Sequence, residues 1–173
     1  MRKSAVYVGV SDHVLVKGKS AWVGFWDRDS PEPVRDLAYH AKTLRRSLLE
    51  FSTGRGFHLV ALDLVDWRRK VDWWNHWHEH ELQEGLDPDY TLRKNNVLRI
   101  GFKNGHRPEF RRAVLYEPSP GSRFHIENLN PPPEVVSCLY PEQIDADIWQ
   151  HRFYLSDPSS TFDYVNDVRG ARG

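Results

Sequence analysis

The order of two kinds of apolar pattern along the chain constrains the fold most strongly. Runs of alternating or β-branched apolar residues predict strands at 5–10, 14–16, 21–26, 57–62, 96–102 and 111–116. Apolar residues at helical spacing predict one helix from the Ser30-Pro31 start to about Glu50 and another from Leu64 to Gly85. This order predicts an α+β fold, with a mixed or antiparallel sheet and flanking helices packed on one face.

The length of the chain, 173 residues, is that of one domain, and we predict a single domain over 1–173. An apolar fraction of 39%, with aromatic residues at 13%, is sufficient for a buried core. The segment 117–173 is rich in proline, and only the stretch from Pro141 to Tyr154 has a helix-like pattern. We therefore predict a tail with one short helix there.

Charge and cysteine content limit the classes of function. Lys plus Arg and Asp plus Glu number 24 each, so any contact with nucleic acid must be local. The single cysteine, Cys138, excludes an internal disulfide and fits the reducing cytosol, which predicts a cytoplasmic protein. No run of 18 apolar residues occurs, so no membrane partner is predicted.

Two acids, Asp27 and Asp29, follow directly after the predicted strand 21–26. Residues at i and i+2 of a strand project from the same face, so the two carboxylates repel each other unless a cation lies between them. Carboxylate oxygens are the ligands that Mg²⁺ and Mn²⁺ prefer. The pair predicts a metal site, while the alternative is two ordinary turn acids before Ser30-Pro31.

The turn from Ser52 to His58 contains Gly54, Arg55 and Gly56. Glycines allow backbone N–H groups to face an anion, and the Ser, Arg and His side chains add further donors. This pattern predicts a triphosphate-binding turn. The alternative is a tight turn beside a buried histidine.

A third acid, Asp87, precedes the predicted strand that carries Arg99, and His106 lies just beyond that strand. An acid followed by cationic groups on a neighbouring strand is what a triphosphate with its metal ions requires. Taken alone, Asp87-Pro88 is only a turn opener.

In combination, these three motifs resemble the archaeo-eukaryotic primase superfamily over residues 21–107. The spacing is similar to that of the short primase-polymerases of plasmids and viruses. The resemblance implies a primase-polymerase catalytic core with an RRM-like unit. The matching positions are Asp27 and Asp29 in the first motif, Ser52, Gly54, Arg55, Gly56 and His58 in the second, and Leu86 and Asp87 in the third, followed by Leu98, Arg99 and His106.

The resemblance implies a template-dependent nucleotidyltransferase, a DNA primase or DNA polymerase, that adds nucleotides to a primer 3′ hydroxyl. Two Mg²⁺ or Mn²⁺ ions would be held by Asp27, Asp29 and Asp87. The other partners implied are single-stranded template with primer and an accessory replication domain or protein. A nucleoside triphosphate would contact Ser52, Gly54, Arg55, His58, Arg99 and His106.

The chain departs from the family in three ways. A bulky Arg28 separates the two acids, no cysteines form the family's zinc-binding element, and the region beyond about Tyr116 matches no known motif. Two alternatives to the polymerase therefore stay open. One is a primase-like module that binds nucleic acid without catalysis, and the other is a metal-dependent nuclease that uses the same acids.

The predicted helix 64–85 contains two further features. Trp73, with Arg68 and Arg69 beside it, is a candidate for stacking on unpaired bases and for contacting template phosphates, although its helical spacing also suits core packing. His76 and His80 are one turn apart and are a candidate zinc pair. A zinc-protease motif fails because Trp77 stands where a Glu is required, and a solvated polar helix end is the alternative.

Overall fold

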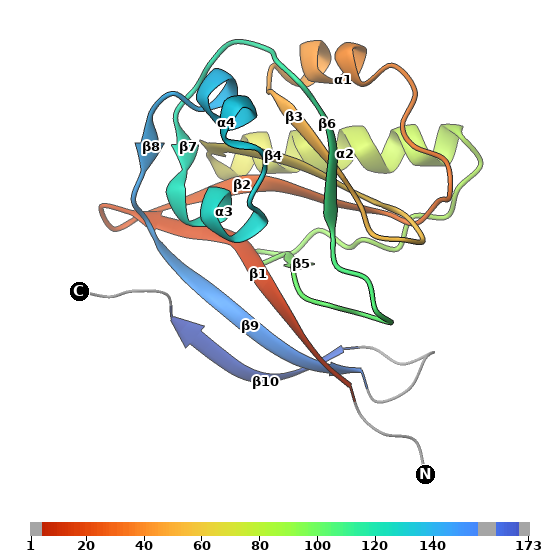
Figure 1. Cartoon of the computed structure of the whole chain (residues 1–173), viewed down its shortest axis with the longest axis vertical. Coiled ribbons are helices and arrows are strands. Elements are labelled where there is room, and N and C mark those ends of the chain that lie inside the picture. Colours follow the sequence, from red (N-terminus) through yellow and green to blue (C-terminus); the bar gives the residue numbers. More distant parts are fainter. Residues whose placement is uncertain (1–4, 156–161, 170–173) are drawn as a thin grey trace.

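The computed structural model describes residues 5–155 and 162–169, and it is an α+β fold built on a mixed, curled sheet (Figure 1). The main strand order is β10-β9-β1-β2-β4-β3-β6. β7 pairs with β4 in antiparallel orientation and with β8 in parallel orientation, and this parallel pair makes the sheet mixed. The strands are β1 (Ala5–Val16), β2 (Lys19–Arg28), β3 (Leu48–Ser52), β4 (Phe57–Val65), β5 (Val97–Arg99), β6 (Glu109–Val114), β7 (Gly121–Ser122), β8 (Gln143–Ile144), β9 (Asp147–Leu155) and β10 (Phe162–Arg169).

Within the described residues, four helices flank the sheet on both faces, which corrects the prediction of helices on one face. α1 (Leu37–Leu44) and α2 (Trp67–Gln83) bury apolar side chains against one face, which includes Trp26 and Leu59. α3 (Arg123–Leu129) and α4 (Pro133–Leu139) cover the other face, which includes Phe25 and Val60. Successive strand residues point to opposite faces, so neighbours such as residues 25 and 26 belong to different cores.

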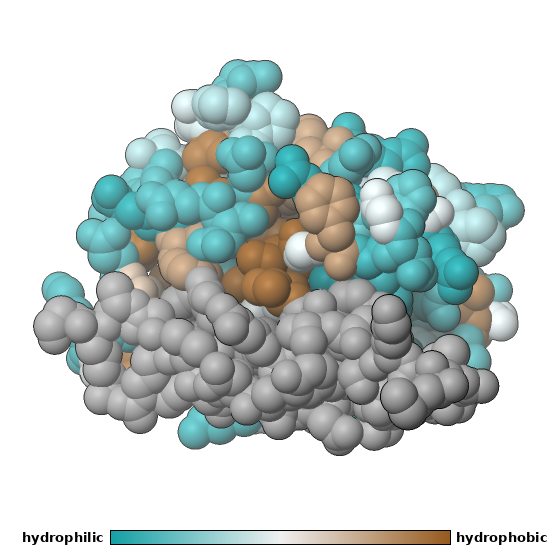
Figure 2. Space-filling view, turned by 60° about the horizontal axis from the view of Figure 1, so that its bottom comes forward, coloured by the Kyte–Doolittle hydropathy of each residue, from teal (hydrophilic) through white to brown (hydrophobic). Residues whose placement is uncertain are grey.

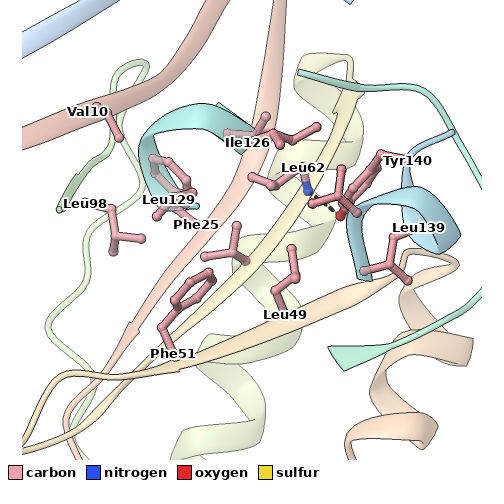
Figure 3. Close-up of a cluster of buried hydrophobic side chains, with 13 residues drawn as sticks. Val10, Phe25, Leu49, Phe51, Leu62, Leu98, Ile126, Leu129, Leu139 and Tyr140 are labelled. Atoms are coloured by element: carbon pink, nitrogen blue, oxygen red, sulfur yellow. Dashed lines mark hydrogen bonds between the residues drawn. The ribbon is translucent and has the colours of Figure 1, made fainter. Parts of the chain in front are cut away.

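The core beneath α3 and α4 is shown in Figure 3. Tyr140, at the end of α4, is 1% exposed, and its hydroxyl oxygen accepts a 2.8 Å hydrogen bond from the backbone N–H of Leu62 in β4. The pairing of β2 with β4 shifts register near this point, between Trp22 and Gly24. The bond therefore fixes α4 to a part of the sheet where the strand ladder is interrupted. In Figure 2, apolar residues gather in the middle of the visible face, with hydrophilic residues on both sides of them.

The first predicted helix is shorter than expected. The Asp36 carboxylate caps α1 by accepting from the N–H of Tyr39, and Arg45 ends the helix in the left-handed conformation at φ 56°. The residues from Leu48 onward, predicted as helix up to Glu50, form β3, which is buried between β4 and the edge strand β6. Because β3 is buried on both faces, its apolar run has no alternation that would distinguish it from a helix.

The C-terminal prediction was wrong in type. The segment expected to be a loose tail contains α3 and α4, and the stretch expected to be helical contains β8 and β9. β9 pairs with β1 on one side and with β10 on the other, so it extends the sheet. The second predicted helix is confirmed as α2, which begins after its cap Asp66 and ends before Gly85. In the part of the chain that the structure describes, no helix is long and apolar enough to cross a membrane.

Candidate functional site

The first two predicted motifs meet where β2 ends and β4 begins. Asp27 on β2 and His58 on β4 are directly paired across the two antiparallel strands, so their side chains project from the same face. His58 Nε2 lies 3.6 Å from Asp27 Oδ1. The Asp27 side chain is 55% exposed whereas that of His58 is 3% exposed, so the carboxylate borders solvent and the imidazole lies behind it.

The electrostatics of Asp27 show which charges are close to it. Desolvation, then the negative charges of Asp29 and Asp89, raise the pKa of Asp27 to about 6, while the positive charges of Arg99 and Lys103 act in the opposite direction. Because the carboxylate is half exposed, water screens part of this effect. The acids of the first motif therefore share their surroundings with an acid and two cations from the segment 89–103.

His58 is neutral at physiological pH. Burial, and then the charge of Arg99, lower the pKa of His58 to about 3. A neutral imidazole carries one N–H, which can serve as a hydrogen-bond donor. Its Nδ1 is buried and has no hydrogen-bond partner among the described residues, so the Nε2 edge is the one that faces Asp27.

The turn that links β3 to β4 is closed by its own hydrogen bonds. The N–H of Gly54 donates to the Ser52 hydroxyl at 3.5 Å, and the N–H of Gly56 donates to the Thr53 hydroxyl at 3.1 Å. Gly54 has φ 91°, a conformation that favours glycine. Gly56 lies so close to β2 that a Cβ there would be 2.2 Å from the carbonyl oxygen of Arg28, so this glycine seats the turn against the acidic strand end.

The third predicted segment reaches the same turn through His106. A Cβ placed on Gly54 would be 3.3 Å from Cγ of His106, so the imidazole packs directly on this glycine. Arg99 donates to the carbonyl oxygens of Gly101 and His106, which holds the connecting loop in place. Of the predicted nucleotide-binding residues, Ser52, Gly54, His58, Arg99 and His106 therefore lie around one strand end, and Arg55 is an exposed residue of the same turn.

Arg28, the bulky residue between the two acids, lies on the opposite face of the sheet. It is 1% exposed, and its guanidinium donates to both carboxylate oxygens of Glu84 at 3.1 and 2.9 Å and to the Glu32 carbonyl oxygen at 3.0 Å. Glu84 caps the C-terminus of α2. A charged bidentate pair of this kind is directional, so Arg28 fixes the end of β2 to α2 and thereby holds Asp27 and Asp29 in place.

The segment after α2 contains a second acid near the site, while the predicted role of Asp87 stays a prediction. Asp89, two residues beyond the predicted Asp87, is the acid of this segment whose charge raises the pKa of Asp27. The repeated acid spacing in Asp87-Pro88-Asp89, like that of Asp27 and Asp29, was the sequence signal that would have included it. The prediction also omitted Lys103, whose charge acts on Asp27 as that of Arg99 does.

The crowded carboxylates fit a hard divalent cation in their chemistry. Mutual repulsion of oxygen ligands is the condition that Mg²⁺ or Mn²⁺ relieves. Among residues 5–155 and 162–169, no group of three or more His, Cys, Asp or Glu side chains has the arrangement of a metal site. These acids therefore suit a metal ion by their oxygen donor atoms and their negative charge, and not by an arrangement that is already that of a metal site.

The predicted nucleic-acid contacts on α2 are not equivalent. Trp73 is 3% exposed, and its indole N–H donates to the Phe25 carbonyl oxygen, so its ring is not exposed for the base stacking that was predicted. Arg68 and Arg69 are exposed, and Arg69 donates to the carbonyl oxygens at the end of α1. Trp67, at the first position of α2, is 41% exposed and is the aromatic residue of this helix that solvent reaches most.

Comparisons with known proteins do not assign a family. A scan against protein-family models, a search of curated proteins and a search of solved structures each returned no match. The geometry therefore has to support a function by itself. It combines two to three carboxylates, two cationic side chains and a neutral imidazole at one sheet end, a set that can bind a divalent cation together with a phosphate group.

Proposed function

We propose that this chain is a template-dependent nucleotidyltransferase of the primase-polymerase kind, which extends a primer 3′ hydroxyl with nucleotides on a single-stranded DNA template. One observation carries the proposal: the acids of the first motif, the histidine of the second and the cations of the third lie together at the paired ends of β2 and β4. These segments are far apart in the sequence, and their order is the one that the primase resemblance requires.

The acidic edge is the part of this site that would hold divalent cations. Asp27 and Asp29 supply two carboxylates from one strand end, and Asp89 or Asp87 supplies a third from the segment after α2. Bound Mg²⁺ or Mn²⁺ lowers the pKa of a coordinated hydroxyl and offsets negative charge on a leaving pyrophosphate. The raised pKa of Asp27, about 6, means that this carboxylate binds a cation more strongly as the pH rises through that value.

The triphosphate would lie between the acidic edge and the cations. Arg99 and Lys103 bring positive charge to the Asp27 side of the site, and Arg55 is exposed on the adjoining turn. Such fixed charges stabilise a phosphoryl group as charge develops on it. The neutral His58 faces the same edge with Nε2, 3.6 Å from Asp27, and would donate a hydrogen bond to a phosphate bound there. The buried Arg28 keeps the strand end rigid.

A primer-extension experiment tests the proposal. The full-length chain is incubated with a labelled primer on single-stranded DNA template, with deoxyribonucleotides or ribonucleotides and with Mg²⁺ or Mn²⁺. We expect the wild-type chain to lengthen the primer and Asp27→Asn to abolish extension. Glu79→Gln, which removes an exposed acid from α2, is the matched control and should extend normally.

The same gel separates the two alternative functions. Shortened DNA in the absence of any triphosphate would identify a metal-dependent nuclease and overturn the proposal. Template binding that is equal in wild type and Asp27→Asn, with no extension by either, would identify a binding module. Comparing Asp89→Asn with Asp87→Asn shows which acid completes the site, and we expect the larger loss from Asp89→Asn because its charge acts on Asp27.

A further inference from the structure

Three histidines from two helices form a cluster on the face of the sheet opposite the acidic edge. His40 lies on α1, and His76 and His80 lie one turn apart on α2. The facing nitrogens, Nδ1 of His40 and Nε2 of His76, are 2.7 Å apart, and the ring centroids of His40 and His80 are 4.4 Å apart. The sequence pattern indicates only the pair on α2, because nothing in the pattern of α1 connects His40 to it.

His40 is buried and His76 is half-buried, and a carboxylate lies beside the third ring, that of His80. Burial, and then the neighbouring rings, lower the pKa of His40 and of His76 to about 4. The Nε2 atom of His80 lies 2.5 Å from the Glu84 carboxylate, one helical turn further along α2. Three imidazoles whose rings lie this close together, with a carboxylate beside them, are a ligand set for a borderline metal.

We propose that His40, His76 and His80 bind one Zn²⁺ ion that ties α1 to α2. Imidazole nitrogens suit Zn²⁺, and three protein nitrogens with one further ligand complete its usual tetrahedral shell. The Glu84 carboxylate lies close to Nε2 of His80 and would act as an outer partner that orients this ring toward the metal. This site is separate from the acidic edge and does not depend on the function proposed for it.

The three imidazoles do not already have the arrangement of a metal site, so binding requires a small movement of the rings. Two nitrogens on a tetrahedral Zn²⁺ are about 3.3 Å apart, given Zn–N bonds of about 2.0 Å. The 2.7 Å between His40 and His76 is a hydrogen bond in which one ring donates a proton to the other. On metal binding the rings separate by roughly half an ångström, and the shared proton moves to the outer nitrogen of its ring, so that both facing nitrogens become ligands.

The cluster has a route from solvent. His76 is half-buried and forms part of the wall of a cavity of about 940 Å³, which is also lined by Thr43, Arg45 and Asp72. His40 is 3% exposed, so the metal would enter from the His76 side and end between the two helices. A metal-binding site needs such an entry path, and a purely packed core does not.

Metal titration of the full-length chain tests the zinc site. The chain is stripped with EDTA and titrated with Zn²⁺ by calorimetry and with Co²⁺ by visible absorption, since tetrahedral Co²⁺ has characteristic bands. We expect one ion per chain in the wild type and affinity at least about tenfold lower in His40→Gln and in His76→Gln. His78→Gln is the matched control, because its ring lies on the same helix but stacks on Trp74 at 4.4 Å.

Each outcome decides the question. Absence of Zn²⁺ uptake by the wild type, or equal uptake by all four proteins, would overturn the site. His40→Gln and His76→Gln could melt without metal at a much lower temperature than His78→Gln. In that case the NMR signals of the histidine rings of the wild type, recorded with and without Zn²⁺, decide instead. Zn²⁺ should shift those of His40, His76 and His80 and leave those of His78 in place, and any other pattern contradicts the proposal. Asp27→Asn should leave zinc uptake unchanged.

Discussion

Replacing Asp27 with Asn should make the metal-free protein more stable at high pH even though it removes a residue that the proposed activity needs. Asp27 shares its surroundings with Asp29 and Asp89, and its pKa is raised from 3.8 to about 6. A carboxyl whose pKa is raised on folding costs stability as it ionises, because the folded state holds its proton more tightly than the unfolded state does. Asn is close in shape and carries no charge.

The size of the gain follows from the shift. About two pKa units correspond to about 3 kcal/mol, which is an upper bound for a fully buried group. The Asp27 side chain is 55% exposed. Screening by water therefore reduces the expected gain in unfolding free energy to about 1 kcal/mol or less. The gain should be present above pH 6 and should disappear toward pH 4, where the wild-type carboxyl is protonated in the folded state.

Urea unfolding in EDTA at pH 4 and at pH 8 measures this difference. The comparison is between wild type, Asp27→Asn and the control Glu79→Gln, which should show no gain at either pH. Addition of Mn²⁺ at pH 8 should raise the stability of the wild type and leave that of Asp27→Asn unchanged. A variant that is less stable than the wild type at pH 8, or equally stabilised at both pH values, would refute the crowding of acids at this strand end.

Three further changes test other parts of the structure. His58→Ala should raise the Michaelis constant for nucleotide in primer extension. A higher Mn²⁺ requirement with unchanged nucleotide affinity would instead show that His58 acts on the neighbouring Asp27 carboxylate. Gly56→Ala should cost about 1–3 kcal/mol in urea unfolding, because its Cβ would be 2.2 Å from a β2 carbonyl oxygen, whereas Gly101→Ala, with its nearest neighbour at 3.6 Å, should cost little. Asp12→Asn should cost about 3–5 kcal/mol, because it removes the carboxylate that lies 2.7 Å from the buried Lys70 ammonium and leaves that charge with backbone carbonyl oxygens alone. A loss below about 1 kcal/mol would show that the pair is not charged.

The parts of the fold that the sequence predicts are those where one face of an element differs from the other. α2 is an example, because Leu64, Trp67, Val71 and Trp74 recur at helical spacing and predict the helix, although the face that it buries is the one with Trp73 and Trp77. β3 gave no such signal, since burial on both faces removes the alternation. The end of α1 was also missed, because Arg45 adopts the left-handed conformation that sequence analysis expects of glycine.

The site could be predicted where its residues are neighbours along one strand end and not where it depends on long-range packing. The spacing of Asp27 and Asp29 was sufficient to place both acids at the end of a strand, and the glycines placed a turn before His58. The packing of His106 on Gly54 depends on how the loop after β5 folds back, which no local pattern encodes. The same limit applies to Asp89, whose position depends on the course of the chain after α2.

Arg28 shows why a residue that looks foreign to a motif can belong to it. Side chains alternate along a strand, so a residue between two acids on one face must point to the other face, where its bulk cannot crowd them. On that face Arg28 is buried and bound to Glu84, the residue that also lies beside His80. One carboxylate at the end of α2 thus contacts both the strand that carries the acidic edge and the histidine cluster. The position between the acids therefore determines how firmly β2 is held to α2, while the chemistry at the edge depends on the two acids that flank it.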